Sequence, residues 1–275
     1  MQTISITNTK NYFGRGNLEL LVIENQYAIA VVSLQGAQLL SYRRKRDNRE
    51  FLWLSDSAVF EAGKAIRGGV PICLPWFGPK PGKAQHGFVR NLAWRHCDGL
   101  AKFEFVGCRN DPRHDFDHDF TATIEMVLGD QLELILSVTN QSSQPMPLSW
   151  ALHSYHRVDD IAQVRISGLD NCEYVDNAKN RQRGVQSGDL GFDGETDLAY
   201  MQVGQVQRIE GQFEVSATNS QSAVVWNPGS ELANRMADLS DHRGFVCLER
   251  GDVLDDQRLL MPSEIFVANI LISAL

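Results

Sequence analysis

The segment from Ala65 to Asn91, AIRGGVPICLPWFGPKPGKAQHGFVRN, gathers side chains that can bind an anion and transfer a proton. Arg67 and Arg90 carry permanent positive charges, and the histidine side chain of His86 ordinarily titrates near neutral pH. Glycines and prolines interrupt the whole segment, so we predict a loop rather than a regular strand or helix. Loops often carry binding residues, and a glycine beside an arginine would let a ligand approach the backbone. From these residues alone, a solvated surface loop is an equally good interpretation.

The composition of the 275-residue chain, with 43% hydrophobic and 22% charged residues, is that of an ordinary folded protein. Its net charge of -8 argues against nucleic acid or an anionic membrane surface as the main partner, because both require an extended basic face. A small anion is still compatible with this charge if cationic side chains gather locally. We expect a cytoplasmic protein, because we find neither a secretory signal pattern nor the roughly 20 apolar residues that cross a bilayer.

The five cysteines form no CxxC motif, and an odd number cannot all pair. We interpret them as reduced thiols in the core, which fits a reducing cytoplasm better than an oxidising compartment. They are Cys73, Cys97, Cys108, Cys172 and Cys247.

Short apolar runs between turn signals predict β-strands on both sides of the loop. Before it, the segment from Leu18 to Leu54 contains ELLVIE, YAIAVVS, AQLLSYR and FLWL. After it, TATIEMVL and QLELILSVT alternate apolar and polar residues around Gly129-Asp130, which predicts a hairpin with one buried face. Further strands are expected in VQRIE, FEVSA, AVVWNPG, GFVCLERG and EIFVANILISAL. The polar, glycine-rich region from Gly168 to Gly211 is assigned to long connections and short strands.

The many strands and the lack of an amphipathic helix of ordinary length favour an all-β fold, a large antiparallel β-sandwich in one domain of residues 1–275. A closed barrel and a propeller are the alternatives. In FVCLERG, alternation puts Phe245, Cys247 and Glu249 on one face. If PMPLSWALHSYHRVDDI is extended, His153 and His156 point to opposite faces.

The acidic run NDPRHDFDHDF suggests a metal site, but it does not match one. An EF-hand loop counted from Asp115 would need glycine at its sixth position and glutamate at its twelfth, where the chain has Phe120 and Met126. The chain also lacks HExxH, P-loop, GxSxG and complete GxGxxG motifs. We therefore expect no metal and no nucleotide cofactor.

Five separated segments together resemble the aldose 1-epimerase superfamily and, within it, the D-hexose-6-phosphate mutarotases. They are AIRGGVPICLPWFG, AQHGFVRN, ALHSYHRV, VVWNPG and FVCLERG, and the resemblance extends from roughly Leu18 to the C-terminus. It implies a galactose mutarotase-like β supersandwich with a cofactor-free cleft on one sheet. The implied reaction interconverts the α and β anomers of a hexose 6-phosphate, with glucose 6-phosphate as the expected substrate. We expect a monomer.

The resemblance also implies roles for five residues. Glu249 matches the catalytic base, His153 the catalytic acid and His86 a histidine that polarises the sugar, while Arg67 and Arg90 match arginines near the phosphate. Ring opening needs one group that removes the anomeric hydroxyl proton and another that protonates the ring oxygen. A carboxylate ionised at neutral pH and a partly protonated histidine suit these tasks. Two charge-assisted phosphate contacts of about 1.5 to 3 kcal/mol each would favour the phosphosugar by about two to four powers of ten.

Other residues of these segments are further candidates. Trp76 and Phe77 could wall the sugar cleft, and Gln85 and Asp238 could bind sugar hydroxyls. Arg250, which follows the expected base, would lower its pKa or bind phosphate if it points into the cleft.

Two other functions remain open. One is a noncatalytic carbohydrate-binding or regulatory protein on the same scaffold. The other is a glycoside hydrolase, which needs two carboxylates flanking the scissile bond. Because Glu249 is the one carboxylate in a recognisable site segment, the hydrolase ranks last.

Overall fold

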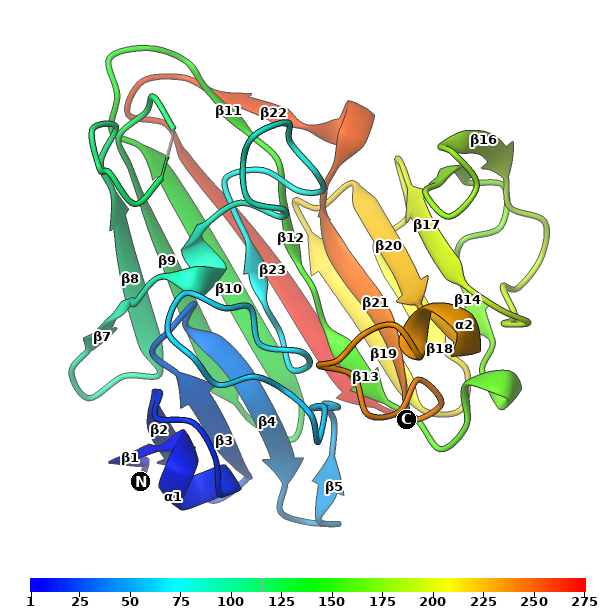
Figure 1. Cartoon of the computed structure of the whole chain (residues 1–275), viewed down its shortest axis with the longest axis horizontal. Helices are drawn as coiled ribbons and strands as arrows, with labels where there is room; N and C mark the ends of the chain where they lie inside the picture. The colour runs from blue at the N-terminus through cyan, green and yellow to red at the C-terminus, as the bar shows by residue number, and fades with distance from the viewer. Residues whose placement is uncertain (115) are drawn as a thin grey trace.

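Apolar faces of two large antiparallel sheets meet to form the core of the protein, as the alternating sequence predicts (Figure 1). The computed structural model describes residues 1–114 and 116–275. The expected large antiparallel β-sandwich is confirmed, and the described residues include only two α-helices, of five residues each.

Four sheets are present among the described residues, and their strands are given in spatial order. The first large sheet, here the outer sheet, contains β14 (Ile166–Ser167), β18 (Val206–Ile209), β19 (Phe213–Thr218), β23 (Ile265–Ala274), β10 (Leu132–Asn140), β9 (Phe120–Leu128), β8 (Lys102–Gly107) and β7 (Arg95–Cys97). The second, here the cleft sheet, contains β16 (Gln182–Val185), β15 (Glu173–Asp176), β17 (Thr196–Tyr200), β20 (Ser222–Asn227), β21 (Phe245–Asp252), β12 (Trp150–Leu152) and β6 (Ile72–Cys73), with β13 (Tyr155–Arg157) also paired to β21. A five-stranded sheet contains β1 (Thr3–Asn8), β2 (Glu19–Glu24), β3 (Ala28–Ser33), β4 (Gln38–Arg44) and β5 (Arg49–Glu50), and a two-stranded one pairs β11 (Met146–Leu148) with β22 (Arg258–Leu260).

Short helices lie in the connections. They are α1 (Thr9–Phe13), α2 (Gly229–Ala233) and the 3-10 helices η1 (Val89–Asn91), η2 (Ile161–Gln163) and η3 (Leu254–Asp256). Among the described residues, none of the helices has the length and apolar character needed to cross a membrane.

The predicted hairpin around Gly129-Asp130 is confirmed. Strands β9 and β10 pair antiparallel with Leu128 opposite Leu132, and the alternate side chains that run back from this turn are buried. In Figure 1 the long C-terminal strand β23 runs beside β10. This part of the outer sheet forms one wall of the core, and the cleft sheet forms the other.

Strand β21 is buried along its whole length, so its two faces have different surroundings. Glu249 lines a cleft on one face, whereas Arg250 points into the sandwich on the other. There the Arg250 guanidinium donates hydrogen bonds to the carbonyl oxygens of Ser220 and Ser222 and to the Gln207 side chain. The hypothesis that Arg250 points into the cleft is therefore wrong. Burial lowers the pKa of this arginine to about 10.

The chain before Leu18 contains β1 and α1, which the sequence reading did not assign. The region from Gly168 to Gly211 contains short strands, as expected: β15, β16 and β17 form one edge of the cleft sheet, and β18 lies in the outer sheet. Only two of the five free cysteines, Cys73 and Cys247, are buried, so the assignment of all five to the core is wrong.

The loop from Ala65 to Asn91 is largely irregular, as predicted, apart from β6 and η1. Three of its five glycines, Gly68, Gly69 and Gly87, lie tightly against other backbone, whereas Gly78 and Gly82 have open space beside them. A Cβ atom on Gly69 would lie 2.1 Å from the carbonyl oxygen of Leu39, and the φ of +65° also requires glycine. The loop is thereby held directly against β4.

Candidate active site

A cleft of about 890 Å³ lies on the cleft sheet, within the usual size range of small-molecule sites. All eight residues expected to bind or transform a ligand line it. They are Arg67, Trp76, Gln85, His86, Arg90, His153, Asp238 and Glu249. Residues from three distant parts of the chain therefore meet in one place.

His153 and Glu249 form a buried pair in this cleft. Glu249 projects from β21, and His153 follows β12, where its backbone N–H donates to the carbonyl oxygen of Pro71 at 2.9 Å. The ring of Tyr155 stacks on His153 at 4.9 Å and nearly parallel, which fixes the imidazole orientation. Nδ1 of His153 lies 3.2 Å from Oε1 of Glu249. A proton can therefore be held by either partner.

Burial disfavours the charged form of both partners. The pKa of Glu249 is raised well above 4.5 by burial and by Asp197, an effect that Arg90 partly offsets. The pKa of His153 is lowered well below 6.5 by burial, with His86, Arg90 and Arg67 adding to the effect. The expectation of ordinary pKa values in this pair is therefore wrong. Loss of the shared proton leaves a buried anion and gain of a second leaves a buried cation, so the pair holds one proton around neutral pH.

The retained proton predicts a pH-dependent stability difference between the wild type and Glu249→Gln. Above pH 4.5 the unfolded chain releases the Glu249 proton while the folded site keeps it, so the wild type loses stability as pH rises. The variant has no such proton. Its free energy of unfolding should increase relative to wild type by about 1.4 kcal/mol per pH unit, until pH reaches the folded pKa.

Denaturant titrations between pH 5.5 and 7.5 would measure this difference, at about half-unit steps. Glu19→Gln, an exposed glutamate in the five-stranded sheet, is the matched control and should show a nearly constant difference. A pH-independent difference for Glu249→Gln would show that the folded site keeps no extra proton.

His86 is held as a neutral hydrogen-bond donor. The backbone N–H of Gly78 donates to its Nδ1 at 3.2 Å, which leaves the proton on Nε2. Burial lowers the pKa of His86 to about 3, and Arg90 and Arg67 add to this effect. The next residue, Gly87, has a φ of +71°, and a Cβ there would lie 1.6 Å from the Leu74 carbonyl oxygen. This tight approach fixes the backbone that presents His86 to the cleft.

Arg67 and Arg90 differ in how many of their guanidinium N–H groups already donate hydrogen bonds within the protein. Arg67 donates through Nε to Oδ2 of Asp238 at 3.2 Å and through Nη1 to the Tyr155 hydroxyl at 3.1 Å. Arg90 donates from Nη2 to the backbone carbonyl of Gln85 at 2.8 Å, and its buried Nε has no hydrogen-bond partner among the described residues. Arg90 therefore has more capacity for an incoming anion.

Trp76, Phe77 and Gln85 occupy the wall of the cleft. Trp76 is 8% exposed and its indole N–H donates to the carbonyl oxygen of Ala84, so most of its surface packs inside the protein. Phe77 meets His86 edge to face at 4.6 Å. Gln85 is exposed at the rim.

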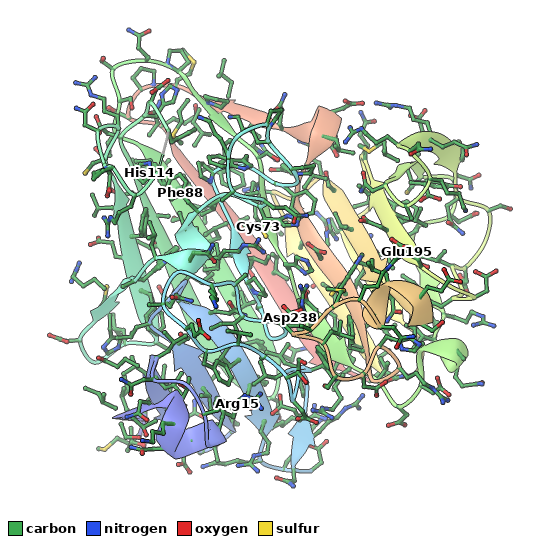
Figure 2. The ribbon with its side chains drawn as sticks, viewed as in Figure 1. Arg15, Cys73, Phe88, His114, Glu195 and Asp238 are labelled. Carbon is green, nitrogen blue, oxygen red and sulfur yellow. The ribbon has the colours of Figure 1, made fainter. Side chains whose placement is uncertain are left out.

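The sequence reading missed several residues of the cleft. They are Tyr155, Asn177, Arg181, Glu195, Asp197 and Trp226. Alternation from His153 would have indicated Tyr155, but no local signal marks Asp197. That carboxylate accepts a hydrogen bond from Asn177 at 2.9 Å, and burial raises its pKa. Asp238 and Glu195, both labelled in Figure 2, bring further negative charge to the cleft.

His156 and His114 do not line the cleft. His156 is fully buried on the face opposite His153, as predicted, and burial lowers its pKa to about 4. His114 stacks on Phe88 with ring centroids 3.9 Å apart. Asp115, from which the rejected EF-hand was counted, lies outside the described residues.

Comparisons with known proteins identify the family of this chain. The family model described as aldose 1-epimerase matches residues 19–273. An Escherichia coli (strain K12) protein, provisionally named glucose-6-phosphate 1-epimerase, is 34% identical over 258 residues, 88% of this chain and 86% of that protein. The crystal structure of a provisionally named mutarotase from Salmonella typhimurium has a TM-score of 0.83 and 31% identity, covering 94% of this chain and 90% of that one.

A more distant structure supports the fold alone. A galactose mutarotase-like protein from Lactobacillus casei ATCC 334 has a TM-score of 0.71 at 17% identity. The match covers 93% of this chain and 100% of that protein. The expected galactose mutarotase-like architecture is thus confirmed. The extent of the family match, together with the 34% identity to a relative of similar length, means that this chain belongs to the aldose 1-epimerase family.

Proposed function

We propose that this protein interconverts the α and β anomers of hexose 6-phosphates, with glucose 6-phosphate as the preferred substrate. The observation that carries the proposal is the buried His153–Glu249 pair, 3.2 Å apart, in a cleft that also contains Arg67 and Arg90. The provisional name of the Escherichia coli relative supports the choice of substrate.

The raised pKa of Glu249 and the lowered pKa of His153 place the shared proton on Glu249 in the resting site, and the reaction begins when this proton moves to His153. Glu249 removes the proton of the anomeric hydroxyl while His153 protonates the ring oxygen, and the bond between C1 and the ring oxygen breaks. The open-chain aldehyde rotates about its C1–C2 bond. Ring closure on the other face returns the two protons, so the pair ends each turnover as it began.

The pKa directions suit this exchange. A carboxylate with a raised pKa is a stronger base, and an imidazolium with a lowered pKa is a stronger acid. Because the pair holds one proton in total, ring opening moves it from the ionic to the neutral form and closure reverses that change. His86 would donate its Nε2 proton to a sugar oxygen, and Arg90 would be the main contact to the phosphate, because Arg67 already donates to Asp238 and Tyr155. The free thiols are consistent with a reducing, cytoplasmic location.

Two-dimensional exchange NMR of glucose 6-phosphate, glucose and galactose tests the proposal directly. We expect the protein to accelerate anomer exchange of the phosphosugar far more than that of the free sugars. Binding without acceleration of any sugar would instead indicate the noncatalytic carbohydrate-binding alternative.

A further inference from the structure

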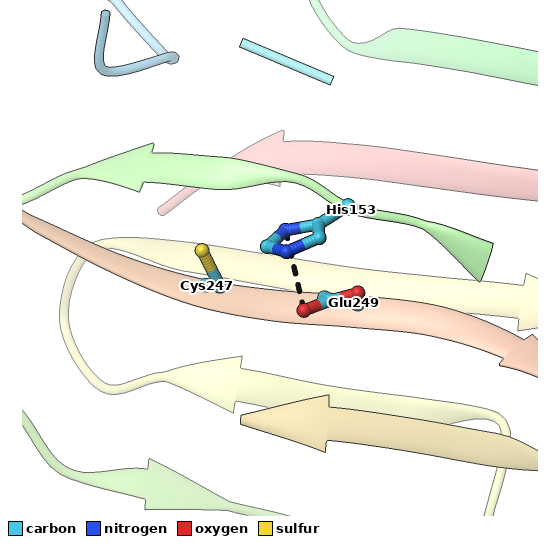
Figure 3. A group of neighbouring side chains, drawn as sticks. All are labelled: His153, Cys247 and Glu249. Carbon is cyan, nitrogen blue, oxygen red and sulfur yellow. Dashed lines mark ion pairs between the residues drawn. The ribbon is translucent and has the colours of Figure 1, made fainter. Parts of the chain in front are cut away.

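Cys247 lies beside the His153–Glu249 pair, and the proposed reaction gives it no role. It precedes Glu249 by two residues on β21, so both side chains leave the strand on the same side. One donor atom from each of the three residues lies within 4.8 Å of the other two (Figure 3). The thiol, the imidazole and the carboxylate thus converge on one small volume.

One donor atom of this group is left unused by the fold. Oε2 of Glu249 is shielded from solvent and has no hydrogen-bond partner among the described residues, whereas Nδ1 of His153 faces Oε1 of Glu249 at 3.2 Å. Buried polar atoms without partners are uncommon and costly, and they often mark a place where a ligand or ion binds. A cation between the three residues would use Oε2 and would replace the proton that Nδ1 shares with Oε1.

The donor set is one that zinc prefers. Zinc binds thiolate at about 2.3 Å and imidazole or carboxylate at about 2.0 to 2.2 Å, so tetrahedral ligands lie roughly 3.3 to 3.7 Å apart. The longest separation here has to shrink by only about 1 Å, which small side-chain rotations can provide. Three protein ligands would leave the fourth position open toward the cleft, because His153 and Glu249 both line it.

The charges also balance. A thiolate, a carboxylate and a neutral imidazole compensate the two positive charges of zinc, which suits a buried site. Arg67 and Arg90 oppose a cation here, whereas the carboxylates of Asp197 and Asp238 in the same cleft favour it.

We infer that His153, Cys247 and Glu249 form a binding site for a zinc ion that inhibits the protein. On binding, the Cys247 thiol loses its proton and the His153–Glu249 pair loses the proton it shares, so two protons leave for each ion bound. The ion then occupies the atoms that transfer protons in the reaction. The inhibitory effect rests on the proposed function, but the binding itself does not.

Binding of zinc to the full-length protein tests the inference without an activity assay. Competition with a chromophoric chelator should give one ion per chain, with an affinity that rises by up to about two powers of ten per pH unit because two protons are released. Cobalt as a spectroscopic substitute should give a thiolate-to-cobalt charge-transfer band and intense visible bands of a tetrahedral site.

Cysteine variants identify the ligand. Cys247→Ala should weaken zinc binding by about 100-fold or more, since loss of even an indirect partner of a ligand typically costs 10- to 100-fold. Cys73→Ala, at the other buried cysteine of the cleft sheet, and Cys108→Ser, at an exposed one, should keep wild-type affinity. Circular dichroism would verify that each variant is folded.

Three results would overturn the inference: equal zinc affinity in folded Cys247→Ala, wild-type cobalt spectra without the charge-transfer band, or zinc affinity lost equally in the control variants. The cobalt spectrum is measured on the wild type, so this result does not depend on whether any variant folds. If zinc binds as described, anomer exchange of glucose 6-phosphate should fall as the site fills. If the protein binds zinc as described but does not accelerate anomer exchange, the metal site is supported and the proposed function is contradicted.

Discussion

Glu249→Gln and His153→Asn should each lower kcat for glucose 6-phosphate anomer exchange by about 100- to 10,000-fold, the usual contribution of a general acid or base. Each substitution keeps the approximate shape of the side chain while removing its ability to take or give the proton. Because the two residues share one proton at 3.2 Å, neither can complete the exchange alone. Substrate binding should change less than kcat, since His86 and the arginines are retained.

The double variant distinguishes a coupled pair from two independent groups. If proton transfer requires both, Glu249→Gln/His153→Asn should be about as slow as either single variant, because residues that act as a unit are not additive. Exchange NMR at saturating substrate measures all three. Glu19→Gln, away from the cleft sheet, is the control for loss of a carboxylate and should retain the wild-type rate. Additive losses, or single variants that keep more than about one tenth of the rate, would contradict these roles.

Regular alternation made the hairpin of β9 and β10 predictable, because one face of each strand is buried and a period of two is a local property of the chain. The edge strand β16 lacks that contrast, since most of its residues are exposed. The chain before Leu18 was missed for a similar reason: β1 is largely exposed and carries no clear apolar face.

The arginines, the histidines and Glu249 of the cleft could be named from the sequence because five separated segments agree with one family. The pKa values of these side chains could not be predicted from the sequence, because the burial of Glu249 and His153 is set by strands far apart in the chain. Asp197 shows this: it lies 52 residues before Glu249 in the sequence, yet its negative charge raises the pKa of the Glu249 carboxylate. Arg250 could have been placed by alternation alone, since neighbours on a strand point to opposite faces.

Arg90→Ala should lower kcat/KM for glucose 6-phosphate by about 10- to 100-fold, the value of one charge-assisted contact. The effect on free glucose should be much smaller. Within the described part of the chain, Arg90 has an unpartnered Nε and a single hydrogen bond, to the carbonyl oxygen of Gln85, so its charge is available to phosphate. Arg67 differs, because it is already held by Asp238 and Tyr155.

Arg67→Ala should therefore slow both phosphorylated and free sugars. Removal of its guanidinium frees Tyr155, whose ring stacks on His153, so the imidazole loses part of its orientation. The ratio of kcat/KM for glucose 6-phosphate to that for glucose separates the two effects: it should fall in Arg90→Ala and change less in Arg67→Ala. Arg90→Lys is the matched control and should recover part of the ratio, because a point charge still attracts phosphate without the two-pronged contact of a guanidinium. If Arg90→Ala slows both sugars equally, Arg90 does not select for phosphate, and the selectivity must come from another cation in the cleft.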